Sequence, residues 1–352
     1  MQKYRSYELD FIKIIATCII IFHHYQQVYG SYFSGLINFY NGNFYWGYIV
    51  ELFFIVSGFF MYKYIKDIKD NKISFKDFFL RRYLRLLPML FLGAILYEII
   101  IYCYIYIYKG SWFGITPSLW GLLIDGLGIQ HGWGFADLSV NYPTWYCSVL
   151  LLMYIYFYAA VKLAKKYNIS EYVIFVFLIL IGCSIPVYNI NYPFLNESVY
   201  RGLYSFFTGI IIAKVLDKRE ISLKGTVLSL FVVVTFIYGY IKQNNLFSAN
   251  INYLLSFVLY PSIIVFLNNK YIKKMFSNKI ISFLSDSSFC VFIIHNPLYP
   301  LLHMIINVFN INVDFNNILY MFLYLLLCWI IGIAIHYLIE SPINKIIKKH
   351  FN

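Results

Sequence analysis

The stretch VIFVFLILI, from Val173 to Ile181, decides the fold class of this chain. It is apolar on every side of a helix, and the stretch LFVVVTFIY, from Leu230 to Tyr238, is nearly so. Strands of a membrane β-barrel alternate apolar and polar residues, so these stretches favour membrane-spanning helices. Hydrophobic residues make up 61% of the 352 residues and charged residues only 12%, too little polar surface for a water-soluble globule. The sequence therefore predicts a helical integral membrane protein.

Apolar runs of this kind recur along the whole chain. A helix rises about 1.5 Å per residue, so about 18 to 25 apolar residues cross a hydrocarbon core of about 30 Å. We predict an all-α polytopic bundle of about ten transmembrane helices, with residues 1–352 forming a single integral membrane domain and no appended soluble domain. The predicted spans are residues 9–29, 44–65, 83–108, 144–164, 172–189, 198–216, 223–241, 252–268, 281–307 and 316–339.

The positive charge of the chain is distributed unevenly. The formal net charge is +12, and 24 of the 28 lysines and arginines fall in segments that share a side with the N-terminus in this topology. Only Lys109, Arg201 and Lys242 fall near the opposite face, and Lys13 lies just inside the first span. Cytoplasmic loops of membrane proteins carry such an excess of basic residues. The bias predicts that both termini lie in the cytoplasm, and it explains the charge without nucleic-acid binding.

Ionisable residues inside the spans are candidates for function, because burying a charge in a bilayer is costly. In the first span, Lys13 and His24 are eleven residues apart and share one face of the helix, whereas His23 points elsewhere. A rise of about 16 Å from Lys13 places His24 near the middle of the membrane. A desolvated, neutral imidazole can accept a proton or attack an acyl group. The alternative is a histidine that bonds to a neighbouring helix or lines a permeation path.

The second span carries a carboxylate, Glu51, seven residues after its outer start and about 10 Å deep. Because His24 lies at a similar depth, Glu51 can fix the tautomer of the imidazole and stabilise its cation during proton transfer. In the alternative, Glu51 bonds to a backbone donor near the outer interface. Ser57 and Gly58 in the same span are small residues, which favour close packing of membrane helices.

Arg82 and Arg85 stand at the predicted cytoplasmic entry of the third span, within the sequence FFLRRYLRLLP. They are one helical turn apart and face the same way, so their guanidinium groups can clamp the phosphates of a nucleotide. The positive-inside rule alone also predicts basic residues at this place. Their position below His24 distinguishes them from an ordinary basic loop.

Two further features concern the cysteines and the longest outer segment. The six cysteines include no Cys-x-x-Cys pair, so we expect apolar packing residues rather than disulfides or a zinc site, and no ligand cluster indicates a metal. The outer segment Lys109–Pro143 is rich in glycine and tryptophan. We expect it to hold a short interfacial or re-entrant helix around Ser118–Leu127.

These residues belong to an ordered series of motifs that resembles the acyltransferase-3 family of integral membrane acyltransferases. The series covers nearly the whole chain, and its order and spacing are more specific than any single piece. The matching residues are Leu9-Asp10, Lys13 and His24; Glu51–Phe54 with Ser57-Gly58-Phe59; Arg82, Arg85 and Pro88; Thr144-Trp145; Ser288-Phe289 with Ile294-His295-Asn296-Pro297; and Glu340-Ser341-Pro342.

The resemblance implies a multi-pass O-acyltransferase of the plasma (inner) membrane. Such an enzyme moves an acyl group, usually acetyl, from cytoplasmic acyl-CoA to a hydroxyl of a surface carbohydrate or glycolipid. Acetyl-CoA is then a donor substrate, and neither a metal nor a permanently bound cofactor is needed. In this scheme the histidine is a general base or a transient acyl carrier. The implied residues are catalytic His24 and Glu51; coenzyme-binding Arg82, Arg85 and Lys13; and substrate-binding Trp145, His295 and Ser57.

Two positions depart from the family pattern, and a third is open to two interpretations. Leu150 stands where many relatives have a glutamate, so a carboxylate at the site has to come from elsewhere, with Glu51 as the candidate. Lys13 replaces an arginine, which keeps the charge but loses the bidentate fork. His295 precedes two prolines, so it is either a second functional imidazole or the cap of a broken helix.

Two other classes of membrane protein share parts of this pattern. A transporter or flippase of a lipid-linked sugar also has many helices and buried ionisable residues, but such folds commonly contain inverted repeats, and none is visible in this sequence. A polysaccharide polymerase or ligase needs outward-facing basic residues to bind a lipid pyrophosphate, and only three fall on that side. No motif assigns the acceptor or the oligomeric state.

Overall fold

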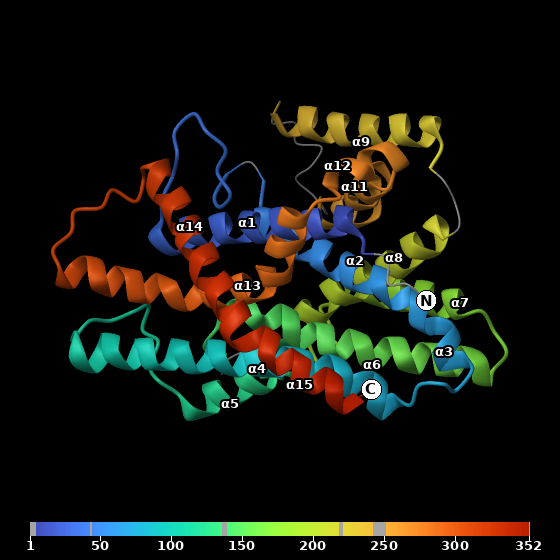
Figure 1. The fold of residues 1–352 in the computed structure, drawn as a ribbon, viewed down its shortest axis with the longest axis horizontal. Helices are drawn as coiled ribbons and strands as arrows, with labels where there is room; N and C mark the ends of the chain where they lie inside the picture. The colour runs from blue at the N-terminus through green and yellow to red at the C-terminus, as the bar shows by residue number, and fades with distance from the viewer. Residues whose placement is uncertain (1–4, 43, 136–138, 218–220, 242–250, 352) are drawn as a thin grey trace.

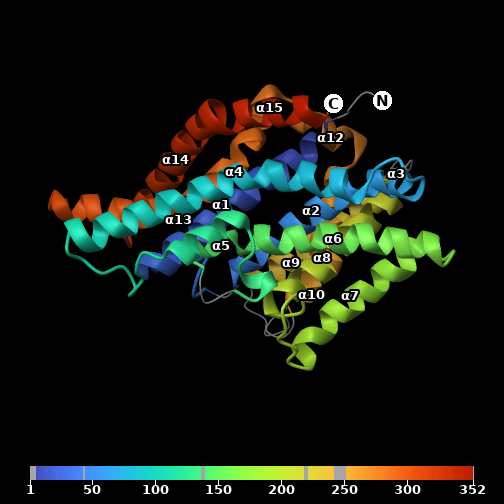
Figure 2. The same cartoon turned by 90° about the horizontal axis from the view of Figure 1, so that it is seen from below.

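The computed structural model describes residues 5–351 except 43, 136–138, 218–220 and 242–250. Within these residues the chain is helical, and its one β-type pairing is an isolated bridge between Tyr192 and Leu195. Long helices run alongside one another in a bundle (Figures 1 and 2). The predicted all-α fold class is confirmed.

The helices follow the numbering of Figure 1. The α-helices are α1 (Tyr7–Tyr29), α2 (Val50–Met61), α3 (Ile65–Lys69), α4 (Phe75–Tyr102), α5 (Leu119–Leu127), α6 (Trp145–Lys166), α7 (Glu171–Val187), α8 (Glu197–Leu216), α9 (Leu223–Ile241), α10 (Ile251–Leu254), α11 (Tyr260–Leu267), α12 (Lys270–Phe276), α13 (Lys279–Val308), α14 (Ile318–Ile335) and α15 (Ser341–Phe351). The π-helical turns are η3 (Cys103–Ile107), η8 (Leu255–Leu259) and η9 (His336–Glu340). Short 3₁₀ turns are η1 (Trp46–Ile49), η2 (Tyr62–Tyr64), η4 (His131–Trp133) and η6 (Tyr142–Thr144).

Each of the ten predicted spans coincides with a helical segment. Among the described residues, seven segments are long and apolar enough to cross a membrane, or eight if the pair Ile251–Leu267 and Lys270–Phe276, bent by 81°, forms one span. The other two predicted spans are the shorter apolar helices Glu171–Val187 and Leu223–Gly239. A helix of about 17 residues is about 26 Å long, which is slightly less than a hydrocarbon core of about 30 Å. These two helices are therefore at the lower limit of length for a span.

α2 and α8 approach each other through two glycines. A Cβ atom on Gly58 would lie 1.9 Å from the carbonyl oxygen of Phe206, and one on Gly209 would lie 2.0 Å from that of Ile55. Neither distance leaves room for a methyl group, so both positions require glycine. The expected packing role of Gly58 is confirmed, since small residues let membrane helices pack closely.

α13 packs against α1, α4 and α14 and brings distant parts of the chain together. The Tyr299 hydroxyl on α13 donates a hydrogen bond of 2.9 Å to the carbonyl of Ile21 on α1. α13 continues as one helix through Pro297 and Pro300. The interpretation of His295 as the cap of a broken helix is therefore wrong.

The polar ends of the helices meet in a way that agrees with the charge-based topology. Arg5 binds Asp286 on α13 at 2.8 Å, and Lys273 on α12 binds Glu8 on α1 at 3.0 Å. The charge distribution predicts that these segments share the cytoplasmic side. The cytoplasmic location of both termini stays a prediction. In the long outer segment, α5 begins after Ser118 and matches the expected short helix.

Candidate active site

His24 on α1 and His295 on α13 face each other where the two helices pack. The Nδ1 atom of His24 lies 2.9 Å from the Nε2 atom of His295, and the ring planes are inclined by only 12°. The ring centroids are 5.1 Å apart, so the two nitrogens occupy the facing edges of the rings, and the contact is a hydrogen bond. Two predicted site residues that are 271 positions apart in the sequence thus form one pair.

The hydrogen bonds of His295 assign the protons of this histidine pair. A carbonyl oxygen only accepts, so His295 Nδ1, which lies 2.5 Å from the carbonyl oxygen of Phe292, carries a proton. With both rings neutral, the lone pair on His295 Nε2 accepts a hydrogen bond from the Nδ1–H group of His24. The remaining nitrogen, His24 Nε2, has a lone pair and no hydrogen-bond partner among the described residues. The network therefore presents His24 Nε2 as a base.

The three histidines in this region differ in their surroundings. His295 has no exposed surface, whereas His24 is partly accessible. His23 is buried and turned away from the pair, with its Nδ1 atom 2.8 Å from the carbonyl oxygen of Phe39 in the loop after α1. His23 thus anchors a loop, and only His24 combines partial exposure with the hydrogen bond to His295.

Glu51 does not bind His24, contrary to expectation. Its carboxylate accepts hydrogen bonds from Arg201 on α8, at 2.7 Å from Nε to Oε1 and 2.8 Å from Nη2 to Oε2. It also accepts one from the Tyr204 hydroxyl at 2.9 Å, and it is fully buried. In such a low-dielectric environment a carboxylate gains more from a bidentate guanidinium than from a neutral imidazole. The prediction that Glu51 orients His24 is therefore wrong, and His295 is the residue that orients it.

Arg201 is a site residue that the motifs did not indicate. Besides its ion pair with Glu51, its guanidinium donates to the carbonyl of Gly47 at 2.9 Å and lies 4.9 Å from the ring centroid of Trp145. Trp145, a predicted substrate contact, is thus buried against this ion pair. Arg201 and Glu51 both lie a few residues inside the outer ends of their predicted spans, and this similar depth was the available signal for pairing them.

The predicted coenzyme-binding residues gather at one end of α1 and α4. The Lys13 ammonium lies 2.8 Å from Asp10 Oδ1, and Arg85 is near enough to interact with Lys13 electrostatically. Arg82 lies one turn before Arg85 on α4, and its guanidinium packs 3.6 Å from the ring centroid of Phe78. We call Lys13, Arg82 and Arg85 the basic cluster.

Arg82 and Arg85 are held differently within the basic cluster. Arg82 is half-buried and donates to the carbonyl of Phe78 at 2.5 Å, while its Nε–H is buried without a hydrogen-bond partner among the described residues. Arg85 is exposed, and the described part of the chain gives it no ion pair. A buried N–H without an acceptor, next to an exposed guanidinium, is an arrangement that can bind an anion.

A row of contacts connects the basic cluster with the histidine pair. The ring of Phe60 lies 5.6 Å from the Lys13 ammonium, and Ser57 stands one turn before Phe60 on α2. The hydroxyls of Ser57 and Tyr146 are 2.9 Å apart, and the ring of Tyr146 lies 6.0 Å from that of Phe292. The row runs from Lys13 through Phe60, Ser57, Tyr146 and Phe292 to His295. The predicted residue Ser57 is therefore part of this row.

The segment before α6 supports the histidine pair through a neighbour of His295. Asp125 on α5 accepts hydrogen bonds from the backbone N–H groups of Val140 at 2.9 Å and Asn141 at 2.5 Å. The side chain of Asn141 in turn accepts a hydrogen bond of 3.1 Å from Asn296, the neighbour of His295. Burial raises the pKa of the Asp125 carboxyl to about 6. No motif indicated Asp125 or Asn141, because their contacts are made between distant segments.

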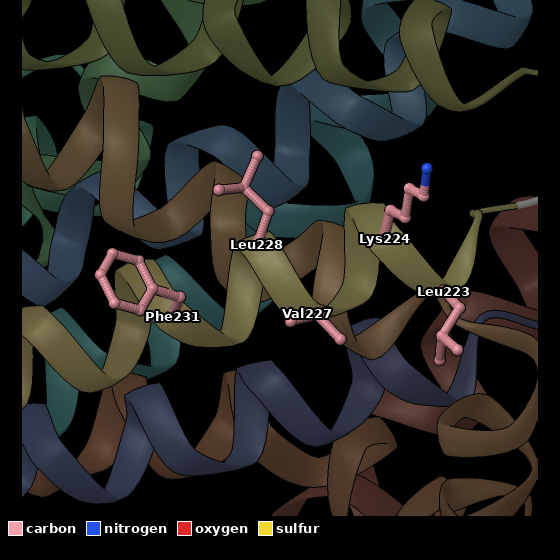
Figure 3. A pocket seen from close by; sticks show the side chains of 5 residues that line it. All are labelled: Leu223, Lys224, Val227, Leu228 and Phe231. Atoms are coloured by element: carbon pink, nitrogen blue, oxygen red, sulfur yellow. The ribbon is translucent and has the colours of Figure 1, made fainter.

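A shallow apolar hollow on α9 lies outside this site (Figure 3). It is lined by Leu223, Lys224, Val227, Leu228 and Phe231. Four of these side chains are apolar and largely exposed, which suits contact with lipid, and none of the five is an imidazole, thiol or carboxylate. The ammonium of Lys224 is its one ionisable group, so the hollow has no partner groups around which to build a catalytic site.

Comparison with known families agrees with the order of the motifs. A family model described as an acyltransferase domain matches residues 6–337, which include the histidine pair, Glu51 and the basic cluster. The comparisons with curated proteins and with solved structures gave no match. The match covers nearly the whole chain, and the described part contains several apolar helices of spanning length. The chain therefore belongs to the acyltransferase-3 family and is a multi-pass membrane acyltransferase.

Proposed function

We propose that this acyltransferase moves an acyl group, acetyl in the first place, from cytoplasmic acyl-CoA to a hydroxyl of a carbohydrate or glycolipid at the cell surface. In this proposal the protein lies in the plasma membrane with both termini in the cytoplasm. The observation that carries it is the unpartnered Nε2 atom of His24, whose lone pair is set by the hydrogen bond to His295. Such a base is suited to activating a hydroxyl group.

The transfer step uses His24 as a general base. His24 Nε2 takes the proton of the acceptor hydroxyl while the hydroxyl oxygen attacks the thioester carbonyl. The new C–O bond then forms and the C–S bond breaks. The positive charge that develops on His24 is stabilised by His295, whose Nε2 accepts the hydrogen bond from Nδ1–H of His24. The departing coenzyme thiolate then takes the proton from His24, and the acylated acceptor and coenzyme A leave.

The basic cluster supplies the donor end of the site. Arg82 offers a buried N–H group without an acceptor among the described residues, and Arg85 offers an exposed guanidinium, so together they suit the phosphates of coenzyme A. Lys13 adds a positive charge on the α1 face that it shares with His24. The contact row from Lys13 to His295 joins the two ends of the site, and in this proposal the pantetheine arm lies along these side chains.

The same lone pair also supports a second route, in which His24 acts as a transient acyl carrier. Nε2 then attacks the thioester itself, coenzyme A leaves, and the acceptor hydroxyl removes the acyl group from the imidazole. The two routes differ in one observable. The carrier route gives an acyl-enzyme when acyl-CoA is supplied without acceptor, and the general-base route does not.

Transfer of radiolabelled acetyl by the purified protein tests the proposal. The protein in lipid nanodiscs is incubated with acetyl-CoA labelled in the acetyl group and with a total extract of surface glycans and glycolipids. We expect labelled glycan from the wild-type protein and a loss of about 10²-fold or more for His24→Ala. His303→Ala is the control, because this histidine lies on α13 like His295, the partner of His24, but bonds to Tyr104, away from the pair. Undiminished transfer by folded His24→Ala protein would overturn the mechanism, and a wild-type protein that labels no glycan would overturn the proposed substrates.

A further inference from the structure

Cys290, His336 and Glu340 meet in a buried cluster away from the histidine pair. The Cys290 thiol lies 3.1 Å from Glu340 Oε2, and His336 Nδ1 lies 2.6 Å from the same oxygen. One donor atom from each residue lies within 4.8 Å of the other two. Cys290 has no exposed surface and Glu340 is 4% exposed, whereas His336 keeps partial access. We call these three residues the thiol cluster.

The local fold explains how the thiol cluster forms. His336 and Glu340 are four residues apart at the two ends of the π-helical turn η9, and π-helical turns are frequently found at functional sites. α13 packs against this turn and contributes Cys290. Met89 on α4 adds a thioether, with its sulfur atom 3.5 Å from the Cys290 sulfur. Thiol, imidazole, carboxylate and thioether groups from three parts of the chain thus converge.

Electrostatics gives the thiol cluster a further property. Glu340 Oε2 faces both the thiol and the imidazole, and no lysine or arginine forms an ion pair with Glu340 in the described part of the chain. A buried carboxylate that has no lysine or arginine partner relies on a protonated imidazole or on a bound ion for its counter-charge in a low-dielectric environment. A divalent ion bound by a thiolate, a carboxylate and a neutral imidazole would form a group with no net charge, because two ligand charges balance the two charges of the ion.

We propose that Cys290, His336 and Glu340 bind a Zn²⁺ ion that fastens the end of α14 to α13. Sulfur, imidazole nitrogen and carboxylate oxygen are the ligands that zinc takes, at distances of about 2.0 to 2.3 Å. Ligand atoms around a tetrahedral zinc are about 3.3 to 3.7 Å apart, so the observed separations of 2.6 and 3.1 Å need only a small opening. A water molecule completes the four ligands. The sequence had favoured a packing role for the cysteines because it contains no closely spaced ligand motif. His336 and Glu340 follow Cys290 by 46 and 50 residues, so only the fold brings the three together.

The zinc ion is expected to be structural. Cys290 is five residues from His295 on α13, so fixing this part of the helix also fixes the position of the histidine pair. Glu340 belongs to the turn between α14 and α15, and a metal bond to it would tie these helices to α13. This inference is independent of the acyl donor and acceptor proposed above.

Metal analysis of the whole protein tests this inference. The protein is purified in detergent without a metal-affinity column, and its zinc content is measured by mass spectrometry. We expect about one Zn²⁺ per chain in the wild type and about a tenth of that or less in Cys290→Ala and His336→Ala. Cys147→Ala is the matched control, because Cys147 on α6 is equally buried and lies outside the thiol cluster, so it should keep its zinc.

A second measurement covers the case in which the variants fold poorly. Wild-type protein that has been stripped with a chelator is titrated with Co²⁺, and the near-ultraviolet band of a thiolate–cobalt bond is recorded. We expect this band and a rise in the thermal midpoint in the wild type and in Cys147→Ala. A wild-type protein that retains no zinc after incubation with equimolar Zn²⁺ and gel filtration, and gives no such band, would show that the cluster is held by hydrogen bonds alone.

Discussion

His295 Nε2 accepts a hydrogen bond from His24 Nδ1 across 2.9 Å, and the Phe292 carbonyl fixes the tautomer of His295. The arrangement resembles a base with an orienting partner, except that the partner is an imidazole instead of a carboxylate. A neutral partner leaves no net charge in the interior of the membrane, where an unpaired carboxylate is costly. The pair therefore orients the base without placing a charge beside it.

The first prediction concerns His295 as a positioning residue. His295→Ala removes the acceptor for His24 Nδ1–H, so His24 loses its fixed tautomer and the support for its developing charge. We expect kcat to fall by about 10²-fold or more with little change in the KM for acetyl-CoA. His295→Gln offers an amide oxygen as an acceptor and is expected to recover part of the rate.

The comparison of these two variants separates positioning from packing. A packing defect would lower stability to a similar extent in both variants and would alter KM as well as kcat. Equal activities of folded His295→Ala and His295→Gln would contradict the role assigned to the hydrogen bond. The measurement is the initial rate of acetyl transfer in nanodiscs, together with the thermal midpoint of each variant.

The second prediction concerns Arg85 at the donor end. Arg85 is exposed and is proposed to bind a phosphate of coenzyme A, so Arg85→Gln removes one charge-assisted contact. We expect the KM for acetyl-CoA to rise by about tenfold or more, since such a contact contributes about 1.5 to 3 kcal/mol. Lys76→Gln removes the same charge from an exposed position near the start of α4 and is the control. Equal KM values for the two variants would argue against a phosphate contact of Arg85.

The third prediction concerns the buried ion pair of Glu51 and Arg201. Removing one member leaves an uncompensated charge, so Glu51→Leu and Arg201→Met are each expected to destabilise the protein by about 3 to 5 kcal/mol. The double variant replaces both charges with apolar groups and should be more stable than either single variant. Unfolding measured in a double-mutant cycle gives the coupling energy. A double variant that loses as much stability as the two single variants together would show that the charges are not coupled.

The sequence allowed the depth of the site residues to be predicted, but not the direction in which each helix faces. Counting residues from the ends of the spans placed His24 and Glu51 at similar depths, and this suggested a contact between them. In the structure α1 turns His24 towards α13, while α2 turns Glu51 towards α8. Hydrophobic stretches such as Val173–Ile181 are apolar on all sides, so they carry no periodic signal for the facing side.

The residues that support the site were harder to predict than those in the motifs. Arg201 was counted as one of three basic residues near the outer face, and its partner was not apparent because Glu51 lies 150 residues earlier. Asp125 accepts a hydrogen bond from the backbone N–H of Asn141. Because almost any residue has such an N–H group, the sequence does not indicate this contact. By contrast, α5 was predictable because Ser118 and Gly128 mark its ends.

The last prediction concerns the pH dependence conferred by Asp125. Burial raises the pKa of this carboxyl from 3.8 to about 6, so the folded protein holds the proton more tightly than the unfolded chain does. The resulting stabilisation is fully present below pH 3.8 and is lost as the pH rises through about 6, with a total of up to about 3 kcal/mol. The thermal midpoint of the wild type should therefore decrease between about pH 4 and pH 7 more steeply than that of Asp125→Asn. The asparagine cannot ionise, but it keeps an oxygen that accepts from the backbone N–H groups of Asn141 and Val140. Asp314→Asn changes an exposed carboxylate in a loop and should retain the wild-type slope. Identical slopes for Asp125→Asn and the wild type would mean that Asp125 has the same pKa in the folded and unfolded protein.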